Sequence, residues 1–121
     1  MLLQKTYLAV AAIAAYTIVR YSGDFAVTPA SAAADRVCGV SDDVDRVANE
    51  PADIIHMGEA RVVAGAAFVA GDLLMSDAQG RAILAAAAAG ANVRTVGYAR
   101  QSAAAAGDIV EIIVQPGTFQ G

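Results

Sequence analysis

The stretch "AGDLLMSDAQGRAILAAAAAGANVRTVGYA", residues 70–99, contains three strand-like runs separated by a polar turn and an alanine tract. The first run ends at Ser76, the second at Leu84, and the third carries Gly97 and Tyr98. Short runs of β-forming residues bounded by Gly, Asp and Ser are typical of strands joined by tight turns. The stretch therefore predicts a hairpin followed by a third strand.

An earlier segment, "AIAAYTIVRYSGDFAVTPASAAADRVCGVS" at residues 12–41, has the same organisation of strand, turn, strand, alanine-rich connection and Gly-bearing strand. The two hairpins are offset by 55 residues, and the later parts, from Gly39 and Gly97 to Ile55 and Ile113, are offset by 58. Length differences that fall in connections are what a duplicated unit shows. We therefore expect two pseudo-repeats, at about 12–58 and 67–117.

The strands expected in the first copy are 16–21, 25–28, 36–41 and 52–57, and those in the second are 72–76, 81–84, 93–99 and 109–114. A further strand is expected between the copies in "GEARVVAG", with Gly58 and Gly65 at its ends. Strands at this spacing predict an all-β fold, a compact small β-sandwich or barrel. The alanine tracts at 85–89 and 102–108 are too short for a stable helix, so each is either a helical turn or an ordered loop.

A chain of 121 residues has the size of one domain. We expect residues 1–11 to form an N-terminal apolar arm or a first strand, and residues 12–121 to form a single β domain. Alanine and valine dominate a composition that is 57% hydrophobic and only 6% aromatic. Because small side chains bury little area, the domain gains little over its conformational entropy. Association with identical or other subunits is therefore expected.

The uncharged run "YLAVAAIAAYTIV", residues 7–19, is too short for a comfortable membrane span of about 20 residues. It matches the apolar region of a signal peptide, with small residues at 30–34 for cleavage, and a secreted or periplasmic β domain is therefore one alternative. The net charge of −4 and the scattered basic residues disfavour nucleic acid as a partner. No membrane partner is expected.

Candidate catalytic groups are few, and we expect no enzyme activity, no cofactor and no metal. Cys38 and His56 lie in different strand-like runs, and nothing in the sequence places them together. The aspartates in "SDDVDR" at residues 41–46 lack the glycine and glutamate of a calcium loop, which favours a solvated turn. The hairpins are similar to those of lipoyl and biotinyl carriers, but the only lysine, Lys5, lies outside them. A carrier-like domain or non-catalytic subunit of an enzyme is the second alternative.

The order "AGDLLMSDAQGRAILA" and then "VGYARQSAAAAGDIVEIIVQPG", preceded by "VCGVSDDVDRVANEPADIIHMGEARVVAG", resembles the cement, or head decoration, proteins of tailed-phage capsids. The resemblance covers residues 12–117 and rests on turns and small residues. The apolar opening "MLLQKTYLAVAA" departs from the more polar start of that family, and Asn49 stands where a glycine is common.

This resemblance implies a compact β domain, a homotrimer, on the outer surface of an icosahedral virion, where it ties neighbouring major capsid protein subunits together. An exposed apolar end on a chain of this kind usually marks an interface. We therefore take Leu2, Leu3, Tyr7 and Leu8 as candidate contact residues for the capsid or for other subunits. The alternative is that these residues form an ordered core strand.

Overall fold

The computed structural model describes residues 3–32, 34–87 and 89–120. In these residues the chain forms nine strands: β1 (Leu3–Ala9), β2 (Ile18–Gly23), β3 (Ala26–Pro29), β4 (Val37–Ser41), β5 (Pro51–Val63), β6 (Leu73–Ser76), β7 (Ala82–Leu84), β8 (Asn92–Ala99) and β9 (Ile109–Gln120). The prediction of an all-β fold is confirmed. Among the described residues there is no helix that could span a membrane.

The first five strands close into a small barrel, which we call the first barrel. Its strands follow the order β1-β3-β2-β4-β5, and β5 pairs again with β1 to complete the circuit. All neighbours are antiparallel except β1 and β3, which run parallel through the pairs Leu8–Ala26 and Ala9–Val27. Of the two predicted architectures, sandwich and barrel, the chain adopts the barrel. The expected N-terminal arm or first strand is β1, a strand of this barrel.

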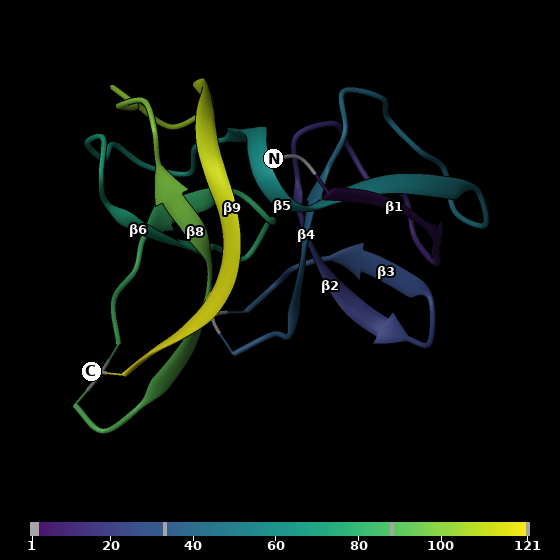
Figure 1. Cartoon of the computed structure of the whole chain (residues 1–121), viewed down its shortest axis with the longest axis horizontal. Coiled ribbons are helices and arrows are strands. Elements are labelled where there is room, and N and C mark those ends of the chain that lie inside the picture. The colour runs from purple at the N-terminus through teal and green to yellow at the C-terminus, as the bar shows by residue number, and fades with distance from the viewer. Residues whose placement is uncertain (1–2, 33, 88, 121) are drawn as a thin grey trace.

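The remaining strands form a second barrel with the later part of β5. Here the order is β5-β9-β8-β6-β7, and β7 returns to the end of β5 through a parallel bridge between Ala64 and Ala82. In Figure 1 the strands β1, β2 and β3 lie on one side, and β6, β8 and β9 lie on the other. The two barrels therefore share one strand, β5.

The strand pairings repeat from one barrel to the other in the same register, which confirms two pseudo-repeated halves. The equivalent pairs are Val19–Pro29 with Leu74–Leu84, Val19–Gly39 with Leu74–Gly97, Val40–Ile55 with Tyr98–Ile113, and Tyr7–Ala52 with Val62–Val110. The offsets are the 55 and 58 residues seen in the sequence. The last of these pairs makes β1 equivalent to the later part of β5. The structural correspondence thus begins before residues 12 and 67, where the sequence comparison starts.

The strands predicted at 52–57 and 58–65 form one continuous strand, so the prediction that Gly58 separates them is wrong. Gly58 lies inside β5 with a φ of +103°, and its backbone stays paired with Val114 of β9. Because glycine has no Cβ, it adopts this torsion without a steric clash. The strand therefore passes from one barrel into the other without ending.

β9 also runs beyond its predicted end at Val114, through Pro116 to Gln120. Proline has no N–H to donate and usually marks the limit of a strand. Here the register between β8 and β9 shifts between Thr95 and Gly97, opposite Pro116, so the ladder is already irregular at that point. The alanine tracts, of which residue 88 is not described, form loops and not helical turns.

Eight buried side chains fill the first barrel, and each has a buried equivalent in the second. They are Tyr7, Ala9, Ile13, Val19, Val27, Cys38, Ala52 and Ile54, equivalent to Val62, Ala64, Phe68, Leu74, Ala82, Val96, Val110 and Ile112. The cluster of the second barrel also contains Ile18, Ala30 and Val40 from the first barrel. The Ile18 N–H donates to the Gly80 carbonyl (2.8 Å). One apolar cluster therefore extends across the joint between the barrels.

Candidate functional site

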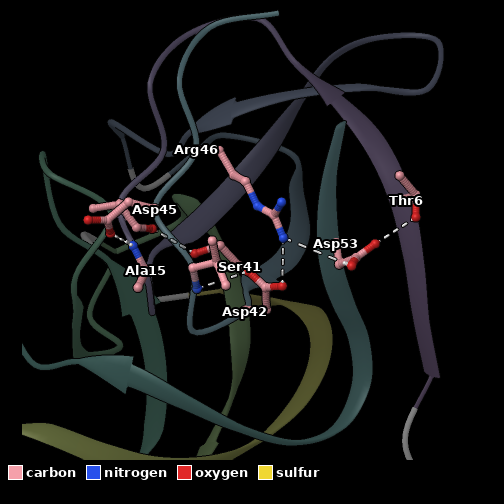
Figure 2. Close-up of polar contacts among 9 residues, drawn as sticks. Thr6, Ala15, Ser41, Asp42, Asp45, Arg46 and Asp53 are labelled. Atoms are coloured by element: carbon pink, nitrogen blue, oxygen red, sulfur yellow. Dashed lines mark hydrogen bonds and ion pairs between the residues drawn. The ribbon is translucent and has the colours of Figure 1, made fainter. Parts of the chain in front are cut away.

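Two aspartates of the loop after β4, Asp42 and Asp45, are held by hydrogen bonds within the protein. Asp42 accepts the Val44 N–H through Oδ1 (3.2 Å) and pairs with Arg46 Nη2 through Oδ2 (3.0 Å). Asp45 Oδ1 accepts the Ala15 N–H at 2.8 Å, as Figure 2 shows. Among the described residues, no group of three or more His, Cys, Asp or Glu side chains is placed to hold a metal ion. The loop is a hydrogen-bonded turn.

The same network ties this loop to β1 and β5. The guanidinium of Arg46 also lies 4.0 Å from Asp53 Oδ2, and the Thr6 hydroxyl donates to Asp53 Oδ1 (2.6 Å). Ser41 donates from its hydroxyl to the carbonyl of Ala14 (2.8 Å). These bonds fasten one end of the first barrel. Their arrangement is structural, because the carboxylates of Asp45 and Asp53 and the Ser41 hydroxyl are each engaged with another part of the same barrel.

Two carboxylates that occupy matched places in the repeats hold equivalent turns. Glu50 accepts the Val47 N–H through Oε1 (2.7 Å), and Asp108 accepts the Ala105 N–H through Oδ2 (3.2 Å). The positions differ by the same 58 residues. Turn formation accounts for both carboxylates.

Cys38 and His56 both belong to the first barrel, close to two tyrosines. The Tyr7 hydroxyl lies 2.6 Å from His56 Nε2, and the ring centroids of Tyr7 and Tyr21 are 6.1 Å apart. Burial raises the pKa of the Cys38 thiol. Burial, assisted by the charge of Lys5, lowers the pKa of His56. The thiol is therefore protonated and the imidazole neutral at neutral pH, and a protonated thiol is a poor nucleophile.

The candidate contact residues at the N-terminus fall on opposite faces of β1. Leu3 and Leu8 are exposed, at 38% and 45%, while Tyr7 is buried among the side chains of the first barrel. Tyr7 and Leu8 lie on opposite faces because successive side chains of a strand alternate, whereas Leu3 lies beyond a register shift between Leu3 and Gln4. Tyr7 is thus a core residue in the isolated chain, as the alternative interpretation expected. Leu2 lies outside the described residues.

Leu8 is part of a larger apolar surface at the end of the first barrel, which we call the apolar end and define as Leu8, Val10, Phe25 and Val47. Their exposures are 45%, 44%, 80% and 62%. The Leu8 N–H donates to the Phe25 carbonyl (2.8 Å), and Val47 lies in the turn whose backbone bonds to Ala9. Single exposed apolar residues are common, but a group gathered at one end is a candidate interaction surface.

Three residues of this surface, Val10, Phe25 and Val47, are not among the predicted contact residues, and Phe25 is the most exposed of them. Its φ of +56° is left-handed, a torsion that bulky side chains rarely adopt. A strained, exposed aromatic side chain persists only where the surrounding structure imposes it, and such residues cluster at functional sites. The "GDF" sequence indicates a turn but not the torsion of its third residue.

The model of the phage cement protein family matches residues 3–115 of the chain. Among solved structures, the chain is similar to the head fiber gp8.5 N base of bacteriophage phi29, with a TM-score of 0.68, 21% identity and 95% coverage of both chains. At that identity the likeness shows a shared fold. No curated protein matches the chain. The family match confirms the resemblance seen in the sequence: the chain belongs to the phage cement protein family and is a structural protein of the phage capsid.

Proposed function

We propose that the chain binds the outer surface of the assembled head, where it contacts neighbouring major capsid protein subunits and stabilises their lattice. The observation that carries the proposal, within a family of cement proteins, is the apolar end with Phe25 at its tip. Large aromatic side chains dominate the binding energy of protein interfaces. The net charge of −4 suits an outer position, away from packaged DNA.

Stabilisation follows from mass action. A protein that binds the assembled shell and not its separated subunits stabilises the shell at each site by RT ln(1 + [L]/Kd), about 2.7 kcal/mol at a hundredfold excess over Kd. This mechanism needs no reactive group. It needs a specific surface and a lattice that presents the matching one.

A homotrimer is part of the same proposal, because cores built from small side chains gain stability from association. Eleven of the fifteen buried residues in the second barrel's cluster are alanine or valine, and the sequence has no tryptophan. Nucleic acid and membrane are not among the proposed partners.

The experiment is to mix the purified full chain with undecorated heads and to image them by electron microscopy. We expect added density on the outside of the head at a symmetry-related position. Phe25→Gly should raise the apparent Kd about tenfold or more, the equivalent of 1.4 kcal/mol. The matched control is Val69→Ser, which truncates a 60% exposed residue of the second barrel. Density on the inner surface, no density at all, or equal binding by Phe25→Gly would contradict the proposal.

A further inference from the structure

The joint between the barrels is formed by a row of apolar side chains on the outside of the first barrel. Ile18 on β2, Val40 on β4 and Ile55 on β5 are direct neighbours in the pairing register. Their chain neighbours Val19 and Ile54 point into the first barrel, so this row points out. Ile18 and Val40 are fully buried nonetheless, because they pack into the cluster of the second barrel. We call these three residues the covered row.

The equivalent row of the second barrel is at the surface. It consists of Leu73 on β6, Tyr98 on β8 and Ile113 on β9, paired in the same register. Tyr98 is 45% exposed, and Leu73 and Ile113 are half-buried. We call these residues the open row. One repeat thus covers this face and the other leaves it open.

The surface that packs against the covered row belongs to the second barrel, and the equivalent surface of the first barrel has different residues. In the second barrel the inward-facing row of β9 ends at Val114, and Ala60 of β5 lies close by; both are buried in the cluster that receives the covered row. The equivalent positions of the first barrel are His56 and Lys5, beside the hydroxyl of Tyr7. We call this end, where β1 begins, the mouth of the first barrel.

The residue differences in the mouth correspond to the residue difference in the open row. The mouth has His56 and Lys5 where the second barrel has Val114 and Ala60. The open row has Tyr98 where the covered row has Val40, and a tyrosine has an apolar ring and a hydroxyl that bonds to polar groups. The rim of the mouth adds Leu3 and Met57, which are paired with each other and exposed at 38% and 50%. The open row, with its tyrosine, and the mouth, with its apolar rim and polar centre, are therefore complementary surfaces.

We propose that the open row of one copy docks against the mouth of the first barrel of a second copy, repeating between chains the joint that exists within one chain. The proposal rests on the self-association stated above and names its surface. Such a contact joins different faces of the two copies, so it closes into a ring or continues as a filament. A ring of three copies would place six barrels around one axis. Within the chain the joint also includes the Gly80 carbonyl, which accepts the Ile18 N–H and is equivalent to the carbonyl of Phe25, so the contact between copies extends from the mouth to Phe25.

The test is the molar mass of the full chain in solution, measured by light scattering for matched variants. Tyr98→Lys places a second cation against Lys5 and should turn the trimer into a monomer. Val44→Lys is the control, because Val44 is 46% exposed, close to the 45% of Tyr98, but lies in the loop at the other end of the first barrel. Unfolding curves show whether each variant is folded.

Lys5→Glu added to Tyr98→Lys creates an opposite pair and should restore the trimer. Retention of the trimer by Tyr98→Lys, a wild-type chain that is monomeric, or lack of restoration in the double variant would overturn the proposed contact. Head binding, measured on the same variants, reports separately on the proposed function. Tyr98→Lys that still decorates heads as a monomer would separate the two surfaces.

Discussion

The two barrels share one plan but differ in the residues that occupy its left-handed positions. The first barrel has Tyr16, Phe25 and Asn49 at φ values of +60°, +56° and +71°, and the second has Gly71, Gly80 and Gly107 at +94°, +74° and +94° in the equivalent places. The left-handed torsion is thus a feature of the repeated backbone and does not depend on which residue occupies the position. A side chain in that region costs about 1–2 kcal/mol relative to glycine, so the first barrel retains side chains at a cost.

The barrels differ also in how their edges are bonded. In the first barrel the Leu8 N–H donates to the Phe25 carbonyl. In the second, the equivalent Val63 N–H donates instead to the carbonyl of Tyr16 (3.0 Å), and the Gly80 carbonyl accepts the Ile18 N–H. The same two groups therefore close one barrel on itself and attach the other to its neighbour. At this position of the repeat, hydrogen bonds to the neighbouring barrel therefore replace the hydrogen bond that closes the first barrel.

The largest expected effect comes from the bulge glycines that both barrels share. A Cβ on Gly39 would overlap the carbonyl of Ile55, and one on Gly97 would overlap the carbonyl of Ile113. Gly39→Ala and Gly97→Ala should each lower the free energy of unfolding by about 3 kcal/mol in urea titrations. Gly117→Ala is the control, since its Cβ would meet the Thr95 hydroxyl at 3.2 Å and no backbone atom closer than 4.0 Å. A strong effect in one barrel alone would break the equivalence.

The next effect separates the barrels at equivalent residues. A Cβ on Gly80 would lie 2.6 Å from Thr17 Cγ2 and 2.9 Å from the Ile18 carbonyl, inside the joint. Gly80→Ala should therefore cost about 2 kcal/mol. Phe25→Gly removes an exposed side chain from the same torsion and should leave stability within about 1 kcal/mol of the wild type. Equal losses of stability for Gly80→Ala and Phe25→Gly in thermal melts would mean that packing in the joint is not the reason for the difference between the two positions.

A smaller effect is expected where both barrels use a side-chain acceptor for the same turn. Asp45 Oδ1 accepts the Ala15 N–H, and Ser102 Oγ accepts the Ala70 N–H at 3.0 Å. Asp45→Ala and Ser102→Ala should each lower the free energy of unfolding by about 1 kcal/mol. The comparison is sharpened if the two losses agree, and it fails if either substitution is neutral while the other is costly.

The smallest effect is a pH dependence confined to the first barrel. Because burial lowers the pKa of His56 below its ordinary 6.5 in the folded state, the unfolded chain takes up a proton that the folded chain resists. Stability from this group is present above pH 6.5 and is lost as pH falls through the lowered pKa. His56→Gln should show a smaller loss than the wild type between pH 7.5 and 5, measured by urea unfolding. Identical pH profiles would exclude His56 as the source.

Local patterns predicted most of the strands because Gly-Asp turns and alternating apolar residues are encoded within a few positions. The equivalence of β1 with the later part of β5 was not visible, since Tyr7 and Val62 share only their inward direction. The same direction explains why Tyr7 is not on the surface. The sequence predicts a strand end at Gly58 because a sequence does not show whether a glycine bends a strand or stops it. The torsion of Phe25 depends on the pairing of distant strands.

The shared strand β5 has a further consequence for how the chain meets a lattice. Two domains joined by a flexible linker adjust their separation, and each contact then adds independently. β5 has no linker, and its 13 residues at about 3.3 Å each extend for roughly 40 Å through both barrels. Surfaces at its two ends are therefore held at one spacing, and if the chain binds the head as proposed, they engage together only on a shell whose subunits match that spacing.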